Sequence, residues 1–517
     1  MAPTKDTIMK KNQLKFLRSK NFRSKNFKIE LSLIILLIVG SVTFSPILKN
    51  SFINWDDPAQ LLENPLVRGF SARNLGKIFT TSVVSEYHPL VTAIFFFEYH
   101  LFGPNPYPYH LHSLILHLIN GWLVFFLFYR LSDKIPVALA GSLLFLVHPF
   151  QVQAVAWISA RKDLLFICFY LASFLSYYFF QSDKKKSLYL LSLLFFICAL
   201  LSKALAITLP VILLLWIYSE KKRITSRELK GILPFIFLAL TTGWFALRMQ
   251  VVREPGSAAH LDFSFENVIL MFGNCKFYLL HLILPFNLSP IYIFPKSINF
   301  WEPPFFFSFF LIFSLLIGLW LYRGNRSLVR GAVFFIITLF PVLRFIPFAG
   351  VEVVAHRFIY LSGAGLFYIG GWIFYRLMRQ GPRRIRRYGI IILWTAIILS
   401  LAILSAHRCR LWKDSPTIWN EAIKKQGKSE LFYHMLADYY FKRGNFQETI
   451  EFCDRSIIVN PAMAYSYLLK ARAQLILGER EEAKNTFEEY ILVLNKLGRW
   501  EQARREEKQL KKFMKVF

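Results

Sequence analysis

The sequence predicts an all-α membrane protein that ends in a soluble helical segment. Hydrophobic residues make up 55% of the 517 residues and charged residues only 18%, below the roughly 25% typical of soluble domains. The apolar residues gather in runs long enough to cross about 30 Å of hydrocarbon. After about residue 410 the composition changes to that of a soluble region with an internal period of 34 residues. The composition therefore excludes an ordinary soluble enzyme.

Twelve apolar runs along the chain are candidates for membrane-spanning helices. They cover residues 29–48, 111–131, 136–153, 163–181, 187–203, 204–219, 231–250, 266–287, 303–322, 328–347, 357–376 and 388–406. The run at 266–287 differs from the others because it contains Asn274, Lys276, His281 and Pro285. Such polar content favours a re-entrant or interfacial helix over a crossing one.

The distribution of Lys and Arg among the loops sets the expected orientation, because short loops rich in these residues stay in the cytoplasm. Basic loops at 184–186 and 221–230 lie on the same side as the N-terminus if every run before them crosses. The basic loops at 323–330 and 379–387 lie on that side only if the run at 266–287 does not cross. We therefore expect about eleven spans and one non-crossing segment, with a cytoplasmic N-terminus and an external C-terminus.

Residues 1–28 form a basic tail with nine Lys and Arg, and no small-residue cleavage site follows the first apolar run. This pattern is typical of a retained anchor with a cytoplasmic tail. The net charge of +30 has the same origin. Residues 413–517 hold 19 basic and 15 acidic residues, so most of the excess lies in the cytoplasmic loops. Membrane orientation therefore explains the charge better than nucleic-acid binding does.

Residues 407–517 show the pattern of tetratricopeptide repeats, which are helix pairs about 34 residues long. A set of large, small, aromatic, Gly and Pro positions recurs 34 residues later, with Asn in place of the proline. The two sets are Tyr433, Leu436, Ala437, Tyr440, Gly444 and Pro461, then Tyr467, Lys470, Ala471, Gln474, Gly478 and Asn495. We expect repeats at about 430–463 and 464–497, preceded by a half-repeat. Because three repeats are usually needed for stability, we expect this short α-solenoid to be stabilised by packing against the membrane domain or against a capping helix at about 498–515.

The longest loop, at about 49–110, is expected outside and begins SFINWDDPAQLLENP. Its neighbouring carboxylates, Asp56 and Asp57, lie a few residues beyond the membrane end of the first helix. Like charges side by side raise one pKa toward the range of a general base. The alternative is structural, because Asp57 precedes Pro58 and suits the N-cap of a helix.

Histidine and asparagine side chains cluster in the same loop and at the start of the second span. They are His88 in YHPL, then His110, His112, His117 and Asn120. The spacing differs from the i, i+4 pair of a zinc helix, and the five cysteines show no paired spacing, so no metal site is expected. These side chains are candidates for orienting the substrate or the carboxylates, or else interfacial groups satisfied by backbone and water.

Several cations fall on the same expected membrane face. They are Arg161 and Lys162 after the HPFQVQAVAWISA segment, Lys203 in LLSKALAITLP, and His356 and Arg357 in VEVVAHRF. Fixed Lys and Arg donors at headgroup level are what a lipid-linked phosphate needs. Taken singly, each is equally well explained as a snorkelling anchor. Together with a carboxylate pair, they suit transfer of a sugar from a polyprenyl-phosphate carrier, in which the carboxylate deprotonates an acceptor hydroxyl.

The segments NWDDPAQLLENP, YHPL, YHLHSLILHLIN, HPFQVQAVAWISARKDLL, LSKALAITLP and AHRFIYLSGAG, followed by the repeats, resemble in order and spacing the TMTC family. Members of this family are membrane O-mannosyltransferases of the GT-C class with tetratricopeptide tails, and the similarity covers residues 30–495. The resemblance implies a GT-C fold for residues 29–406 and a polyprenyl-phosphate-linked sugar donor, most often mannose, as co-substrate without a further cofactor. It also implies inversion at the anomeric carbon and Ser or Thr hydroxyls of exported proteins as acceptors.

By position, the resemblance assigns the catalytic base to Asp56 or Asp57, of which we favour Asp56. It assigns binding of the donor phosphate to Arg161, Lys203 and Arg357. The repeats are expected to dock the protein acceptor above the loop at 49–110, in keeping with the concave grooves of such solenoids.

Two features depart from the animal members of the family. Ala204 follows Lys203 where those proteins generally have Glu, and the repeat array is much shorter. Both indicate a bacterial member, placed in the inner membrane with its repeats in the periplasm; the ER membrane is the eukaryotic equivalent. Two alternatives remain open, a glycosyltransferase acting on surface glycans or lipids and a non-catalytic scaffold whose repeats recruit partners.

Overall fold

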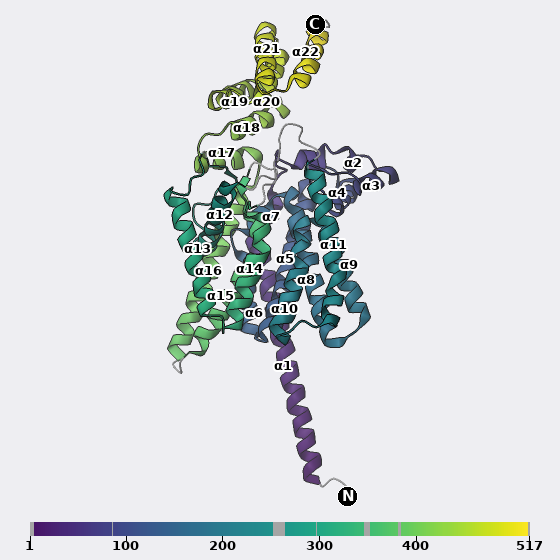
Figure 1. Ribbon diagram of the computed structural model, residues 1–517, viewed down its shortest axis with the longest axis vertical. Coiled ribbons are helices and arrows are strands. Elements are labelled where there is room, and N and C mark those ends of the chain that lie inside the picture. Colours follow the sequence, from purple (N-terminus) through teal and green to yellow (C-terminus); the bar gives the residue numbers. More distant parts are fainter. Residues whose placement is uncertain are drawn as a thin grey trace.

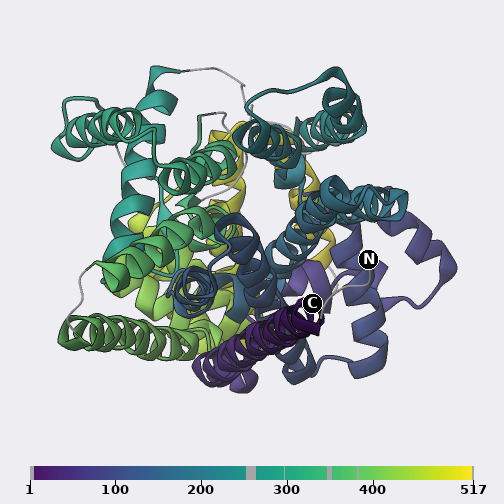
Figure 2. The same ribbon diagram turned by 90° about the horizontal axis from the view of Figure 1, so that it is seen from below.

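The structure is a computed structural model that describes residues 5–84, 86–251, 264–295, 297–345, 352–380 and 384–514. Its long helices form a bundle. Part of α1 (Lys5–Phe44) projects from one end of the bundle, and a smaller set of C-terminal helices lies beyond the other end (Figure 1). Figure 2 shows the bundle along its length, with α1 and α16 (Arg384–Leu411) at its periphery. The all-α class predicted from the sequence is confirmed.

Each of the twelve apolar runs contains a helix. After α1 these helices are α5 (Pro106–Ser132), α6 (Ile135–Val147), α8 (Arg161–Asp183), α9 (Lys186–Ser202), α10 (Leu209–Lys221), α11 (Ser226–Val251), α12 (Phe265–Ile283), α13 (Pro303–Leu321), α14 (Arg326–Leu339), α15 (Gly363–Arg379) and α16. The run at 136–153 is divided, because α6 ends before Pro149 and the chain restarts as α7 (Gln151–Ala156). Residues 1–4 of the predicted tail and 346–347 of one predicted span lie outside the described residues.

Short 3₁₀ helices and one small sheet join these elements near the end of the bundle that faces the C-terminal helices. The 3₁₀ helices are η1 (Ser45–Lys49), η3 (Ile158–Ala160), η4 (Ala204–Thr208), η5 (Phe340–Val342) and η6 (His356–Ile359). The sheet pairs β1 (Tyr292–Ile293) antiparallel with β2 (Glu352–Val354). This pairing holds the segment before η6 against the loop that follows α12.

Seven helices among the described residues are long and apolar enough to cross a membrane. They cover Ser24–Lys49, Pro106–Ser132, Ile158–Asp183, Ala204–Lys221, Ser226–Phe245, Pro303–Leu321 and Ile385–Leu411, and α4 (Pro89–Phe102), α6 and α9 are shorter apolar helices. The prediction of a multi-pass membrane protein is confirmed. The count of eleven spans, the non-crossing role of 266–287 and the orientation of the termini stay predictions, because length and composition alone do not decide them.

The loop predicted at 49–110 is folded into short helices. They are the π-helix η2 (Pro58–Leu62), α2 (Pro65–Arg68), α3 (Ala72–Ile78) and the longer α4. The helix α4 departs from the polar character of the loop, since Phe97, Leu101 and Phe102 are exposed on it. An exposed apolar face beside a membrane bundle is typical of a helix that lies in the membrane interface.

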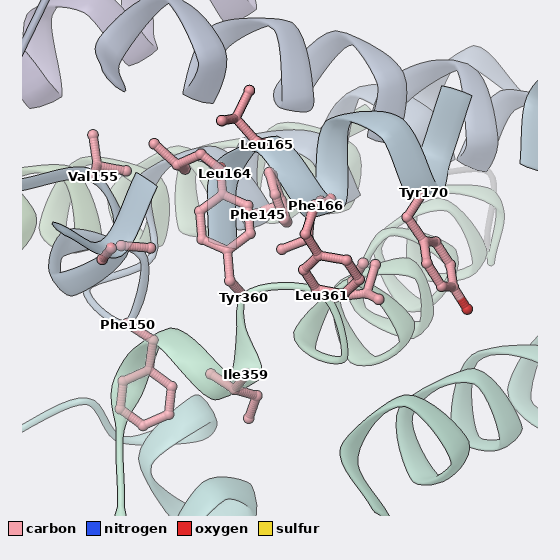
Figure 3. Close-up of a cluster of buried hydrophobic side chains, with 14 of the residues drawn as sticks. Phe145, Phe150, Val155, Leu164, Leu165, Phe166, Tyr170, Ile359, Tyr360 and Leu361 are labelled. Carbon is pink, nitrogen blue, oxygen red and sulfur yellow. The ribbon is translucent and has the colours of Figure 1, made fainter. Parts of the chain in front are cut away.

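Tyr360 lies in the core where α5 and α6 meet the chain that leaves η6 (Figure 3). Its ring packs edge-on against Phe145, with 5.1 Å between the ring centroids. Its hydroxyl group lies 2.5 Å from His117 Nδ1 and 3.4 Å from Asn120 Nδ2. These contacts fix the end of η6, and therefore the position of Arg357, relative to the bundle.

The C-terminal helices fall within the windows predicted for the repeats. They are α17 (Ser415–Gln426), α18 (Glu430–Lys442), α19 (Phe446–Val459), α20 (Ala464–Leu477), α21 (Arg480–Lys496) and α22 (Trp500–Met514). Successive helices pack on one another from α17 to α22. Their identity as tetratricopeptide repeats and the domain boundaries of the chain stay predictions.

Candidate functional site

The first loop is anchored to the C-terminal helices immediately before the carboxylate pair. Asn54 donates its side-chain N–H groups to the Met435 carbonyl at 2.7 Å and to Asp438 Oδ2 at 3.0 Å. Its side-chain oxygen accepts the indole N–H of Trp419 at 2.8 Å, and its backbone N–H donates to the Ser415 hydroxyl at 2.9 Å. Two residues from Asp56, the chain is thus held by α17 and α18.

Stacked tryptophans reinforce this contact. Trp55 stacks on Trp157 with 5.2 Å between ring centroids and lies 5.4 Å from the Trp419 ring. Trp157 in turn stacks on Trp412 at 5.9 Å. The indoles form a rigid apolar wall between the first loop, the segment before α8 and the end of α16.

Asp57 is buried and accepts three hydrogen bonds. Its Oδ2 accepts the backbone N–H of Ile53 at 2.8 Å, and its Oδ1 accepts both the backbone N–H of Ser159 at 3.0 Å and the Ser159 hydroxyl. Burial raises the pKa of Asp57 to about 6, against the lowering effect of these hydrogen bonds. Asp57 does stand at the N-cap position of η2, but its side chain makes no capping bond there. Instead it joins the first loop to the segment that leads into α8.

Asp56 lies next to this structural carboxylate in a different environment. It is partly buried and makes no side-chain hydrogen bond within the described part of the chain. Burial raises the pKa of Asp56 above its ordinary value, and Glu86 and Glu352 act in the same direction, against Lys162 and Arg357. Asp56 is therefore the carboxylate of the pair with free acceptor capacity and a raised pKa.

Lys162 and Arg357 lie close enough to Asp56 to act on its pKa, and Lys203 lies near both of these cations. Each of the three pairs with a carboxylate. The distances are 2.5 Å from Lys162 Nζ to Glu86 Oε2, 2.5 Å from Lys203 Nζ to Asp163 Oδ1, and 2.6 Å from Arg357 Nη1 to Glu352 Oε2. We call these six residues together with Asp56 the Asp56 cluster. Its members come from the first loop, α8, the α9–η4 junction, β2 and η6, so five separate segments meet here.

The carboxylates of the cluster differ in exposure. The Asp163 side chain is 1% exposed and that of Glu352 is 5% exposed, whereas the Glu86 side chain is 46% exposed. Desolvation acts to raise the pKa of Glu86, but Lys162, His88 and Lys203 together lower it to about 2. Glu86 is therefore an ionised carboxylate at the rim of the cluster, and its ion pair with Lys162 is the one open to water and to an incoming anion.

Aromatic rings and one amide hold Arg357 in place. Its guanidinium lies over Trp157, 5.1 Å from the ring centroid, and over Phe358 at 4.9 Å. Its backbone N–H donates to Gln153 Oε1 at 2.9 Å, and Gln153 Nε2 lies 3.5 Å from Glu352 Oε1. These contacts therefore hold the guanidinium group of Arg357 in a fixed position.

The structure pairs Arg161 with a carboxylate that is not a member of the Asp56 cluster. It is fully buried, and its guanidinium donates to Glu98 and, at 2.5 Å, to the Tyr109 carbonyl. His112 Nδ1 contacts the other oxygen of Glu98 at 2.5 Å. A buried charge without a carboxylate would be strongly unfavourable, so Glu98 accounts for the position of Arg161. The expectation that Arg161 binds a phosphate together with Lys203 and Arg357 stays a prediction.

The predicted histidines and Asn120 lie at three different places. His88 lies at the rim of the Asp56 cluster, where burial and Lys162 lower its pKa to about 4, and its Nδ1 lies 3.2 Å from Thr92 Oγ1. His110 is buried beside the backbone of the first loop, and Asn120 contacts Tyr360 in the core.

His356 is also separated from the cluster although it precedes Arg357. Its ring stacks on Phe150 with 4.7 Å between centroids, and its Nε2 lies 3.3 Å from the Tyr292 hydroxyl group. Burial lowers its pKa well below the ordinary value. His356 therefore packs among aromatic rings, and its expected role in phosphate binding stays a prediction.

Sequence reasoning missed the carboxylates that pair with the cations. Glu86 stands directly before the YHPL segment, and Glu352 lies five residues before Arg357. The signal was available, since a buried cation in a membrane protein requires an acidic partner. The pairs of Lys162 with Glu86 and of Lys203 with Asp163 depend on contacts between segments far apart in the chain. Among the described residues, no group of three or more His, Cys, Asp or Glu side chains is arranged to hold a metal ion.

The sequence is similar to known mannosyltransferases. The family model described as dolichyl-phosphate-mannose-protein mannosyltransferase matches residues 87–245. The Caenorhabditis elegans protein O-mannosyl-transferase F38B6.6 is 22% identical over 414 residues, which are 76% of this chain and 57% of that protein. The Drosophila melanogaster protein O-mannosyl-transferase Tmtc1 is 33% identical over 169 residues, which are 31% of this chain and 19% of that protein.

These matches confirm the resemblance to the TMTC family and agree with the glycosyltransferase class expected from the motifs. The chain spans little more than half the length of the nematode relative and about a fifth of the fly one.

Two solved structures are similar at low identity. The Archaeoglobus fulgidus oligosaccharyltransferase tethered with an acceptor peptide is 11% identical with a TM-score of 0.40, covering 74% of this chain and 55% of that chain. ArnT from Cupriavidus metallidurans bound to undecaprenyl phosphate is 15% identical with a TM-score of 0.41, covering 87% of this chain and 78% of that chain.

The different roles of the paired carboxylates predict different effects on stability. Asp57→Ala leaves the buried N–H groups of Ile53 and Ser159 without acceptors, so we expect a loss of about 1–3 kcal/mol for each. Asp56→Ala removes no hydrogen bond and is expected to change stability by less than about 0.5 kcal/mol. Thermal unfolding of the two purified variants in the same detergent checks this, and equal melting temperatures would contradict it.

Proposed function

We propose that this TMTC-like chain is a membrane glycosyltransferase that moves a sugar from a polyprenyl-phosphate carrier to hydroxyl groups of exported proteins. The observation that carries the proposal is the Asp56 cluster, in which a carboxylate without a hydrogen-bond partner among the described residues lies beside Lys162 and Arg357. The family match covers two of its segments, since residues 87–245 include Lys162 and Lys203. The names of the relatives support mannose as the sugar and a protein as the acceptor.

Asp56 is the proposed base. It removes the proton from an acceptor hydroxyl group as that oxygen forms a bond to the anomeric carbon of the donor sugar. The bond between the anomeric carbon and the phosphate oxygen breaks, and the phosphate leaves with the electron pair. A raised pKa suits this role, because general bases work best when their pKa approaches the operating pH. Asp57 then acts by holding the loop that presents Asp56.

Lys162, Lys203 and Arg357 are the proposed partners of the leaving phosphate. Their carboxylates keep them charged and positioned before the donor arrives. The exposed Glu86 is the partner that an incoming phosphate most readily displaces, since its pair with Lys162 is the most open of the three. Arg161 has no such role in this proposal, because its guanidinium is committed to Glu98.

The C-terminal helices have two proposed roles. The contacts of Asn54 and Trp55 with α17 and α18 position the loop that carries Asp56. The helices from α20 onward, which lie farther from the bundle (Figure 1), are the proposed docking surface for the protein acceptor. We propose that this end of the molecule faces the periplasm of a bacterial cell.

Replacing Asp56 with Asn tests the catalytic proposal. Loss of the general base is expected to lower kcat by about 10²–10⁴-fold, measured as sugar transfer from lipid-linked mannose to a Ser- or Thr-containing peptide. Glu63→Gln is the matched control, because Glu63 is a carboxylate of the same loop and its ion pair with Lys442 of α18 is exposed, so its loss is expected to change kcat little. With wild-type protein, kcat should rise with pH through a pKa above 3.8, since the raised pKa keeps Asp56 protonated at lower pH.

Full sugar transfer by the Asp56→Asn variant would contradict the proposal that Asp56 is the general base. If the wild-type chain transferred no sugar, with mannose, glucose, arabinose or galactosamine as donor, the scaffold alternative would be favoured. Transfer to a glycan or lipid but to no peptide would instead favour an enzyme of surface glycans.

Asn54→Ala is predicted to slow catalysis without weakening donor binding. The substitution removes three hydrogen bonds to α17 and α18, and displacement of a base by about 1 Å costs on the order of 10²-fold. The cations come from other segments, so KM for the donor should stay within twofold. Asn74→Ala is the control, since Asn74 bonds only within the first loop. Equal kcat for both variants would argue against positioning by the C-terminal helices.

Removal of α20, α21 and α22 separates acceptor docking from loop positioning. A chain that ends after α19 keeps every contact of Asn54, so hydrolysis of the donor should be unchanged. Glycosylation of folded protein acceptors is expected to fall at least about tenfold, because the loss of one binding surface of about 1.4 kcal/mol gives this factor. Equal losses of hydrolysis and glycosylation would contradict a docking role.

A further inference from the structure

A cavity of about 280 Å³ lies between α5, α8, α10, α14 and α15, near the end of the bundle from which α1 projects (Figure 1). Its walls are mainly apolar and include Leu127, Phe174, Ile212, Trp216 and Phe334. Its volume is close to the lower limit of sites that hold small molecules, roughly 300–1,000 Å³. No member of the Asp56 cluster lines it.

Four cations line the same cavity, Lys222, Arg323, Arg326 and Arg330. Lys222 follows the end of α10, and Arg323 and Arg326 flank the turn between α13 and α14. These three take part in none of the ion pairs or side-chain hydrogen bonds found among the described residues, apart from a cation–π contact of Arg323 with Trp320 at 4.9 Å. The three side chains are exposed, and within the described part of the chain no carboxylate is paired with them.

Arg330 has a different, structural role at this cavity. Its guanidinium donates to the Leu131 carbonyl at 3.0 Å and to Glu220 Oε1 at 2.5 Å. It thereby connects α14 to the end of α5 and to α10, and α10 packs on α14. The connection keeps the cavity open and leaves the other three cations for an external anion.

The shape and charge of the cavity fit only an amphipathic anion. An apolar hole bounded by membrane-spanning helices is filled favourably by hydrocarbon, because burial of apolar surface is worth about 25 cal/mol per Å². Three cations at the mouth select an anionic headgroup, as basic pockets between membrane helices do. A free phosphate ion would satisfy the cations but leave the apolar walls uncovered.

We infer that this cavity binds an anionic glycerophospholipid, with its phosphate at Lys222, Arg323 and Arg326 and the first part of one acyl chain inside. The site is independent of the proposed sugar transfer. The bound lipid would fill the space between α10 and α14 and join two halves of the bundle, so it acts as a structural ligand at the end of the molecule opposite the Asp56 cluster.

Native mass spectrometry of the purified full-length chain tests the inference, with phosphatidylglycerol and phosphatidylcholine of identical acyl chains as probes. Phosphatidylglycerol should bind more tightly. The triple variant Lys222→Ala, Arg323→Ala, Arg326→Ala should bind it more than tenfold more weakly, since each basic residue near an anionic lipid adds roughly fivefold. The control Arg379→Ala, Arg386→Ala, Arg387→Ala removes three exposed cations outside the cavity and should stay within twofold.

A second variant keeps the test decisive if the triple variant fails to fold. Val333→Phe fills the cavity and changes no charge, so phosphatidylglycerol should again bind more than tenfold more weakly. Equal binding of the two lipids, or equal losses in the triple variant and its control, would overturn the inference. Normal binding by Val333→Phe together with displacement by inorganic phosphate would identify a free-anion site instead. Preferential binding of a polyprenyl phosphate would assign the cavity to the carrier lipid and overturn it as well.

Discussion

The pairing of each buried cation with a carboxylate is the interaction on which the site depends. A guanidinium or ammonium group is costly to bury alone, and loss of one partner leaves an uncompensated charge. Four such ion pairs lie near one end of the bundle among the described residues. They are Arg161 with Glu98, Lys162 with Glu86, Lys203 with Asp163, and Arg357 with Glu352. Three of the pairs join segments that are 40 to 76 residues apart, whereas Arg357 and Glu352 are five residues apart. These ion pairs therefore hold the segments of the site together at this end of the bundle.

Asp56 stands apart from this rule because no cation is committed to it. Its neighbour Asp57 accepts three hydrogen bonds and secures the loop, so one of the two adjacent carboxylates is structural and the other is the proposed base. The same loop is held from the other side by Asn54 and the tryptophans, through contacts with α17 and α18. A shift of α17 or α18 would consequently move Asn54 and Trp55, the two residues directly before Asp56. This short connection couples the position of the C-terminal helices to the position of the proposed base.

The cations at the two ends of the bundle differ in whether a carboxylate is paired with them. Around Asp56, the cations are paired and buried, so an anion must displace a carboxylate to reach them. At the opposite end, Lys222, Arg323 and Arg326 lie at an apolar cavity without acidic partners among the described residues. The first arrangement suits a substrate that binds and leaves, because displacement keeps its affinity moderate. The second suits a ligand that stays, because nothing competes for the cations.

The sequence alone determined the membrane class, the twelve helical runs, the repeat windows and the resemblance to the TMTC family, because these follow from local composition, period and motif order. It also selected Asp56, Lys162, Lys203 and Arg357, since charged residues beside apolar runs stand out from their surroundings.

Only the tertiary structure decided how these residues are grouped. It gave Asp57 and Asp56 different partners, paired Arg161 with Glu98, and paired the cations of the cluster with Glu86, Asp163 and Glu352. The physical reason is that a buried charge in a membrane protein needs a partner of opposite charge. Three of the four partners here lie 40 to 76 residues away in the chain, and Glu352 lies five residues before Arg357 across the turn from β2 to η6. Local pattern records where a charge stands in the chain, whereas the packing of helices determines which charge it meets.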